Sequence, residues 1–237
     1  MGGLFHLVLK QPLYNLLIWL YDVIPGADMG VAIIALTLVV KLILWPLTHS
    51  SLVSQKALQD LQPKLDALKA EHGADKEKLA KATMELYAKE KVNPLSSCLP
   101  VLLQLPVLIA LYSVLSTGLT ADGLVDLYPF VRNPGSINEM FAGFLDLTAK
   151  SIPLALLTGA ATFVQTKMLM AKRPPKPVTP GAKDEDMLAA MNKSMTYTMP
   201  VVTAVIGAGL PAGLLLYWLT NTLASIAQQA IAFRKKS

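Results

Sequence analysis

Cysteine is almost absent from this chain, because Cys98 is the only one among 237 residues. A single cysteine forms no internal disulfide and has no second thiol for a metal site, so we expect it to pack in an apolar core. Charge is also scarce, at 16% of residues, whereas 53% are hydrophobic and the mean hydropathy is +0.47. This composition predicts an integral membrane protein. The net charge of +5 is modest and does not indicate nucleic-acid binding.

Acidic residues are missing from the interior of every long apolar segment, which argues against the acid relays of proton-coupled pumps. The three histidines, His6, His49 and His72, lie outside these segments or at their edges. Neither H-E-x-x-H nor G-x-S-x-G occurs, so intramembrane hydrolysis has no support. We therefore predict a protein that is not an enzyme and that uses no cofactor or metal.

Five apolar segments are predicted to cross the bilayer as helices, which gives an all-α integral membrane protein. They are residues 29–49, 93–117, 151–170, 195–210 and 211–233. Because the number of spans is odd, two equal inverted repeats are not available, which lowers the expectation of a secondary transporter.

The segment 50–92 is predicted to be a helical hairpin outside the membrane. It contains eight lysines, and its leucines at positions 58, 61, 65 and 68 recur at helical spacing. The pattern resumes after Gly73, which suggests two antiparallel helices joined there. A solvated charged spacer is the alternative interpretation.

The distribution of positive charge predicts the orientation in the membrane. Lysine and arginine concentrate in the hairpin, in the Pro-rich segment 171–194 and in the tail 234–237, whereas the loop 118–150 carries few of them. Positive residues favour the cytoplasmic side, so we expect the amino terminus outside and the carboxyl terminus in the cytoplasm. Residues 1–28 are predicted to form an amphipathic interfacial helix on the outer side, in preference to a cleaved signal peptide.

Lys41 lies in the middle of the first apolar segment and is the leading functional candidate. A lysine at the centre of a membrane helix costs about 2.5–3.5 kcal/mol on insertion scales, so it usually faces other helices or a wet cavity. Snorkelling to the interface is the simpler alternative. Neutral polar residues also lie within the spans and could line a wet groove or join helices by hydrogen bonds. They are Thr37, Gln104, Thr158, Thr162, Gln165, Thr166, Asn221 and Thr222.

Three stretches of the chain resemble the YidC/Oxa family of membrane protein insertases, in its bacterial branch. They read VVKLILWPLTHSSLVSQKALQDLQPKLDALK, LYAKEKVNPLSSCLPVLLQLPVLIALYSVL and MTYTMPVVTAVIGAGLPAGLLLYWLTNTLASIAQQAI. Their order and combination are more specific than any one of them, and the likeness extends over nearly the whole chain.

The resemblance implies five core helices around a hydrophilic groove that opens to the cytoplasm and the lipid. In this family a groove cation receives the polar end of an incoming chain, and Lys41 falls at its position. Gln165 and Trp218 match groove-lining residues, with Gln104, Tyr217 and Asn221 as weaker candidates. The implied role is an insertase and chaperone of nascent membrane proteins in the bacterial plasma (inner) membrane.

The family pattern differs from this chain in two respects that bear on mechanism and partners. The usual groove cation is arginine, and lysine lacks its bidentate pairing. The basic tail after Phe233 has only four residues, so ribosome docking is a weaker expectation than contact with clients. The Sec translocon is a further partner to be tested.

Two other functions stay open: an anion channel or transporter that uses Lys41 as its selectivity charge, and a chaperone that holds clients without translocating them.

Overall fold

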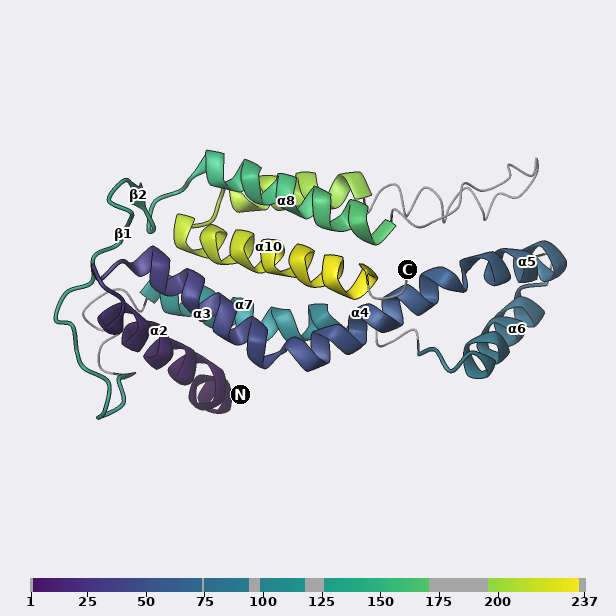
Figure 1. The fold of residues 1–237 in the computed structure, drawn as a ribbon, viewed down its shortest axis with the longest axis horizontal. Helices are drawn as coiled ribbons and strands as arrows, with labels where there is room; N and C mark the ends of the chain where they lie inside the picture. Colours follow the sequence, from purple (N-terminus) through teal and green to yellow (C-terminus); the bar gives the residue numbers. More distant parts are fainter. Residues whose placement is uncertain (1, 74, 94–98, 118–125, 171–195, 235–237) are drawn as a thin grey trace.

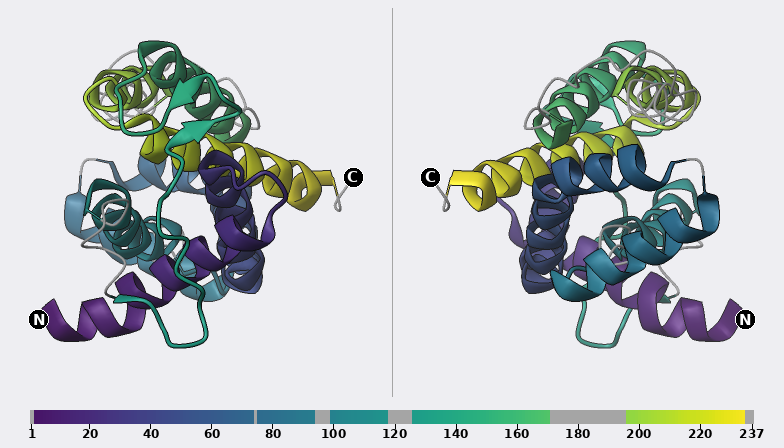
Figure 2. Two further views of the ribbon diagram at one scale, coloured as in Figure 1. Left: turned by 90° about the vertical axis from the view of Figure 1, so that its left-hand side faces the viewer. Right: turned by 90° about the vertical axis from the view of Figure 1, so that its right-hand side faces the viewer.

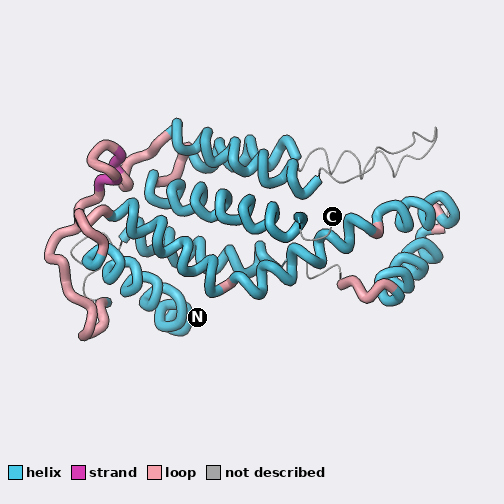
Figure 3. The backbone as a smooth tube through the Cα atoms, in the orientation of Figure 1, coloured by secondary structure: helices cyan, strands magenta, loops and turns pink. Residues whose placement is uncertain are grey.

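The structure describes residues 2–73, 75–93, 99–117, 126–170 and 196–234, and helices form most of this part of the chain (Figures 1 and 3). The structure is a computed structural model. Figure 2 looks along the bundle from its two ends, with a small strand pair at one end and two polar helices at the other. The prediction of a helical fold is confirmed in that the described part of the chain is mostly helical.

The amino-terminal helices α1 (Gly2–Phe5), η1 (His6–Lys10) and α2 (Gln11–Val23) follow one another without a loop. Tyr14, Leu17 and Ile18 of α2 are buried, whereas Trp19 is 47% exposed. The helix is therefore amphipathic, and it packs against α3 and α7. It ends before Gly26 and Ala27, both with positive φ, and Asp28 then caps the next helix.

Helix α3 (Met29–Ile43) is followed by α4 (Trp45–Asp60) after a bend of 67° at Leu44. Pro46 explains the break, because it has no N–H to donate to the Leu42 carbonyl and its ring clashes with that carbonyl. The predicted segment 29–49 is thus two helices that meet at an angle. Helix α4 continues to Asp60, well into the segment predicted as a hairpin.

The predicted hairpin segment contains α5 (Gln62–His72) and α6 (Lys76–Lys89), which contact each other. Lys64 forms an ion pair with Glu90 just beyond α6. The carboxylate of Asp75 caps α6 by accepting from the Lys78 amide at 3.1 Å. Hydrogen bonds from Lys78 hold the pKa of Asp75 below its usual value, so the cap stays ionised at neutral pH.

Helix α10 (Ala212–Arg234) is the central helix of the bundle, and it contacts α3, α4, α7 (Leu99–Thr117) and α8 (Ile152–Met170). Figure 1 shows it between α8 and α3. The helix Thr196–Gly207 packs closely against α8, because a Cβ on Gly159 would lie 2.9 Å from the Cβ of Ala204. Small residues allow two helices to approach this closely.

One end of the bundle is closed by the segment that precedes α8. It contains the antiparallel pair β1 (Met140–Phe141) and β2 (Leu145–Asp146). The amides of Ala212 and Gly213 donate to the carbonyls of Ala149 and Leu147 at 2.8 Å each, which ties this segment to the start of α10. The predicted loop 118–150 therefore has local structure over its described part, residues 126–150.

Helix length and hydropathy single out few complete spans among the described residues. Ile152–Leu169 of α8 is long and apolar enough by itself, and α3 with α4 qualifies only as a bent pair. Gln104–Leu115 and Thr196–Gly207 are shorter apolar helices. The five-span arrangement stays a prediction. The predicted Pro-rich segment 171–194, Cys98 and positions 235–237 of the predicted tail lie outside the described residues.

Candidate functional site

A stripe of polar side chains runs along α10 and faces three neighbouring helices. Tyr217, Asn221 and Ser225 are spaced four residues apart, so they lie on one face of the helix, and Gln228 continues the stripe. We call these four residues the α10 stripe. Helices α7, α3 and α4 each contribute one hydrogen-bonding partner to it, so the stripe is the polar seam of an otherwise apolar bundle.

Lys41, near the end of α3, reaches the middle of the α10 stripe. Its Nζ donates to Ser225 Oγ at 2.7 Å, and Ser225 Oγ in turn donates to the Asn221 carbonyl at 2.8 Å. None of the ion pairs within 4.0 Å among the described residues includes Lys41. The Lys41 side chain is half-buried and points toward α10, where its hydrogen-bond partner is neutral. Among the described residues, no carboxylate within 4.0 Å neutralises its charge.

Gln104 of α7 and Tyr217 of α10 form the second link of the stripe. The Gln104 side-chain amide donates to the Tyr217 hydroxyl, which lies on a residue only 2% exposed. Both residues were expected on a groove from the family resemblance, and the structure brings them together. Gln104 is two residues from Pro106, which lies inside α7.

The third link was not predicted from the sequence. Gln228 of α10 donates to Thr48 Oγ1 of α4 at 2.7 Å, and both residues are buried. Ser225 was missed as well. The signal for Ser225 and Gln228 was present, since they continue the helical spacing that begins at Tyr217 and Asn221. Thr48 gave no such signal, because only the bend at Leu44 turns α4 toward α10.

The other predicted groove residues lie beside the stripe. Trp218 follows Tyr217 and is therefore rotated by about 100° around α10, and it is partly exposed. Gln165 lies on α8 and is also partly exposed. Neither side chain has a hydrogen bond to another described residue, so the structure places them near the helix surfaces and not in the links.

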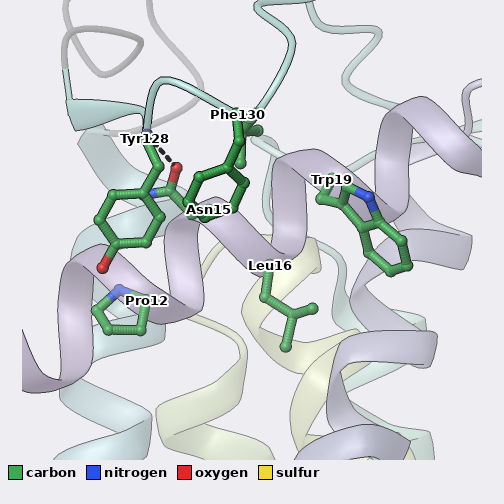
Figure 4. Close-up of a pocket in the computed structure, with 7 residues that line it drawn as sticks. Pro12, Asn15, Leu16, Trp19, Tyr128 and Phe130 are labelled. Atoms are coloured by element: carbon green, nitrogen blue, oxygen red, sulfur yellow. Dashed lines mark hydrogen bonds between the residues drawn. The ribbon is translucent and has the colours of Figure 1, made fainter.

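A separate cavity of about 300 Å³ lies between α2 and the segment that follows residue 125 (Figure 4). Asn15 closes one side, because its side chain donates to the Asp126 carbonyl at 3.0 Å and accepts from the Tyr128 amide at 2.6 Å. The cavity is lined by Pro12, Asn15, Leu16, Trp19, Tyr128, Phe130 and Val131. It has no charged lining residue and does not include Lys41.

An apolar helical bundle with an inward-facing polar seam defines a helical membrane protein. Comparison with protein-family models identifies its family, because the model of the 60Kd inner membrane protein matches residues 19–237. The chain belongs to this family.

Curated relatives agree with that assignment. The chain is 37% identical to a membrane protein insertase YidC of Pelobacter propionicus over 227 residues, which cover 96% of this chain and 38% of the relative. It is 41% identical to a membrane protein insertase YidC of an Anaeromyxobacter species over 209 residues, which cover 88% of this chain and 33% of the relative. The chain thus spans about a third of the length of these relatives.

A solved structure supports the same relationship. It is described as an active YidC insertase with the first transmembrane domain resolved, and it superposes with a TM-score of 0.59 at 29% identity. The match covers 92% of this chain and 45% of the solved one. The similarity therefore includes most of the described bundle.

Proposed function

We propose that this chain inserts membrane proteins into the bacterial inner membrane and helps them to fold. In this proposal the α10 stripe and Lys41 line a hydrophilic groove, open to the cytoplasm, that receives the polar segment of a client. The observation that carries the proposal is the pairing of Lys41 with the neutral Ser225. Because this pairing leaves its positive charge uncancelled, an acidic client segment can supply the counter-charge.

The physical task is to lower the cost of moving a polar tail through hydrocarbon. Hydroxyl and amide groups of the stripe replace part of the tail's hydration, and Lys41 attracts its carboxylates. The predicted span 195–210 is short, because its 16 residues reach about 24 Å at 1.5 Å per residue, against about 30 Å of hydrocarbon. Such a short helix favours local thinning of the bilayer. No covalent chemistry or cofactor is required.

The proposed orientation puts the amino terminus outside and the carboxyl terminus in the cytoplasm, with five spans. Helices α5 and α6 then extend into the cytoplasm, where they are available to clients and, as further partners to be tested, the Sec translocon and the ribosome. The membrane potential favours outward movement of a negative tail by about 2.3 kcal/mol per charge per 100 mV.

The proposal predicts a charge dependence at position 41. Lys41→Glu is expected to reduce insertion of a client with an acidic outer tail by at least about tenfold, because losing 1.4 kcal/mol of attraction already has that effect. Lys41→Arg should retain activity, since it keeps the charge. Protease protection of the client tail in proteoliposomes measures both variants.

Controls separate insertion from the alternatives. Lys150→Glu makes the same charge change at an exposed position outside α5, α6 and the α10 stripe and should leave insertion intact. Equal activity of the wild type and Lys41→Glu would refute the role of the cation.

Ion flux through sealed vesicles without a client would favour an anion channel. Client binding without protection of the client tail would favour a chaperone that holds clients without translocating them. Photocrosslinking from position 41 to a client during insertion tests the contact directly.

A further inference from the structure

A second cavity, of about 220 Å³, lies where α4 meets the carboxyl-terminal end of α10. At about 30 Å³ per water molecule, it has room for about seven waters or a group of similar size. It is lined by His49, Leu52, Val53, Lys56, Ala57, Asp60, Ala232 and Phe233. None of these residues belongs to the α10 stripe, and Lys41 does not reach this cavity.

Two nitrogen atoms of the cavity residues are buried without a hydrogen-bond partner among the described residues: Lys56 Nζ and His49 Nδ1. Lys56 Nζ lies 5.8 Å from the centre of the Phe233 ring, a cation–π contact that positions the ammonium but leaves its hydrogen-bond donors free. Asp60 lies one turn further along α4 but forms no ion pair with Lys56 within 4.0 Å. Burying an unpaired cation is costly, so the site is built to hold an anion.

Apolar side chains from both helices line the cavity. Val53 of α4 is 49% exposed, and Phe233 near the end of α10 is partly exposed. Hydrocarbon chains can cover these side chains while a linked anion occupies the cavity. An anion that carries its own hydrocarbon chains matches both features, and basic pockets between membrane helices bind such headgroups.

We propose that this cavity binds the phosphate group of an anionic phospholipid, with Lys56 and His49 as donors and the acyl chains along Val53 and Phe233. The bound lipid bridges α4 and α10 and so holds the bent helix against the bundle. The proposal depends on the protein being in a membrane and does not depend on insertion activity.

Lipid titration followed by native mass spectrometry tests the site on the detergent-solubilised full chain. Phosphatidylglycerol should bind at least about fivefold more tightly than phosphatidylcholine with the same acyl chains, since a basic residue near a lipid surface contributes about 1 kcal/mol. Lys56→Gln should abolish this preference, and Lys56→Arg should keep it. Asp60→Asn should strengthen binding by removing a repulsive carboxylate.

Lys81→Gln is the matched control, because it removes one positive charge at an exposed position of α6. It should leave the lipid preference unchanged. Equal loss with Lys81→Gln would refute the cavity as the site, since only the net charge would then matter. Equal binding of both lipids, or displacement of phosphatidylglycerol by millimolar inorganic phosphate alone, would refute an anionic lipid as the occupant.

Thermal unfolding in nanodiscs provides a second readout that does not rely on counting lipids. In phosphatidylcholine alone, Lys56→Met should be at least as stable as the wild type, because it removes an unpaired buried cation. Added phosphatidylglycerol should raise the Tm of the wild type by about 2–4 °C and leave that of Lys56→Met unchanged, because a ligand stabilises the state that binds it. An equal rise in both proteins would refute the proposal.

Discussion

At the scale of single residues, the α10 stripe explains why neutral polar groups accumulate in an apolar bundle. Each link joins one residue of α10 to one residue of another helix, and the links involve Gln104, Lys41 and Thr48. Lys41 differs from the other two because its partner is neutral while it carries a charge. The same side chain thus contributes a structural hydrogen bond and, in the proposed function, an attraction for clients.

The link between Gln104 and Tyr217 is predicted to be structural. Hydrogen bonds between membrane helices contribute about 0.6 kcal/mol on average. We expect Gln104→Leu and Tyr217→Phe each to lower the free energy of unfolding by about this amount, and the double variant to lose little more than either alone. Unfolding in mixed micelles measures this cycle. Strictly additive losses would show that the two side chains do not interact.

At the scale of elements, the bend between α3 and α4 determines which residues reach α10. Pro46 ends the first helix of the pair, and the 67° turn brings Thr48 to Gln228. Because Gln228 is buried, separating the two would leave its side-chain amide without this acceptor, whereas the Thr48 hydroxyl would still donate to the Leu44 and Trp45 carbonyls. Pro46 therefore affects contacts away from its own position, because it sets the direction in which α4 leaves α3.

Pro46→Ala is predicted to straighten the pair. A continuous helix from Val31 to Asp60 would be about 43 Å long at 1.5 Å per residue, and the bend shortens that distance. Spin labels at these two exposed positions should report a longer distance in Pro46→Ala than in the wild type. Leu47→Ala, which keeps the proline, should leave the distance unchanged. No change in Pro46→Ala would show that contacts with α10 maintain the bend.

At the scale of the whole molecule, the polar helices α5 and α6 and the strand pair lie at opposite ends of the bundle (Figure 1). This separation matches the charge distribution in the sequence, with lysines at one end and few cations at the other. It supports the proposed orientation, in which α5 and α6 extend into the cytoplasm and the strand pair lies outside.

Cysteine labelling tests that orientation. In a Cys98→Ser background, Ser136→Cys should react with a membrane-impermeant maleimide added to intact spheroplasts, because it is predicted to lie outside. Lys81→Cys should react only after the membrane is opened. Both positions are exposed on the protein surface, so access to the reagent depends on the side of the membrane. The reverse pattern would invert the topology.

The sequence by itself determined the helical class and singled out Lys41 as the functional candidate, because composition and the cost of a charge in hydrocarbon are local properties. Only the tertiary structure decided the partners: Ser225 for Lys41, Tyr217 for Gln104 and Thr48 for Gln228. Ser225 lies 184 residues from Lys41, and no local spacing relates the two. Pairings of this kind depend on how bent helices cross, which follows from packing over the whole bundle.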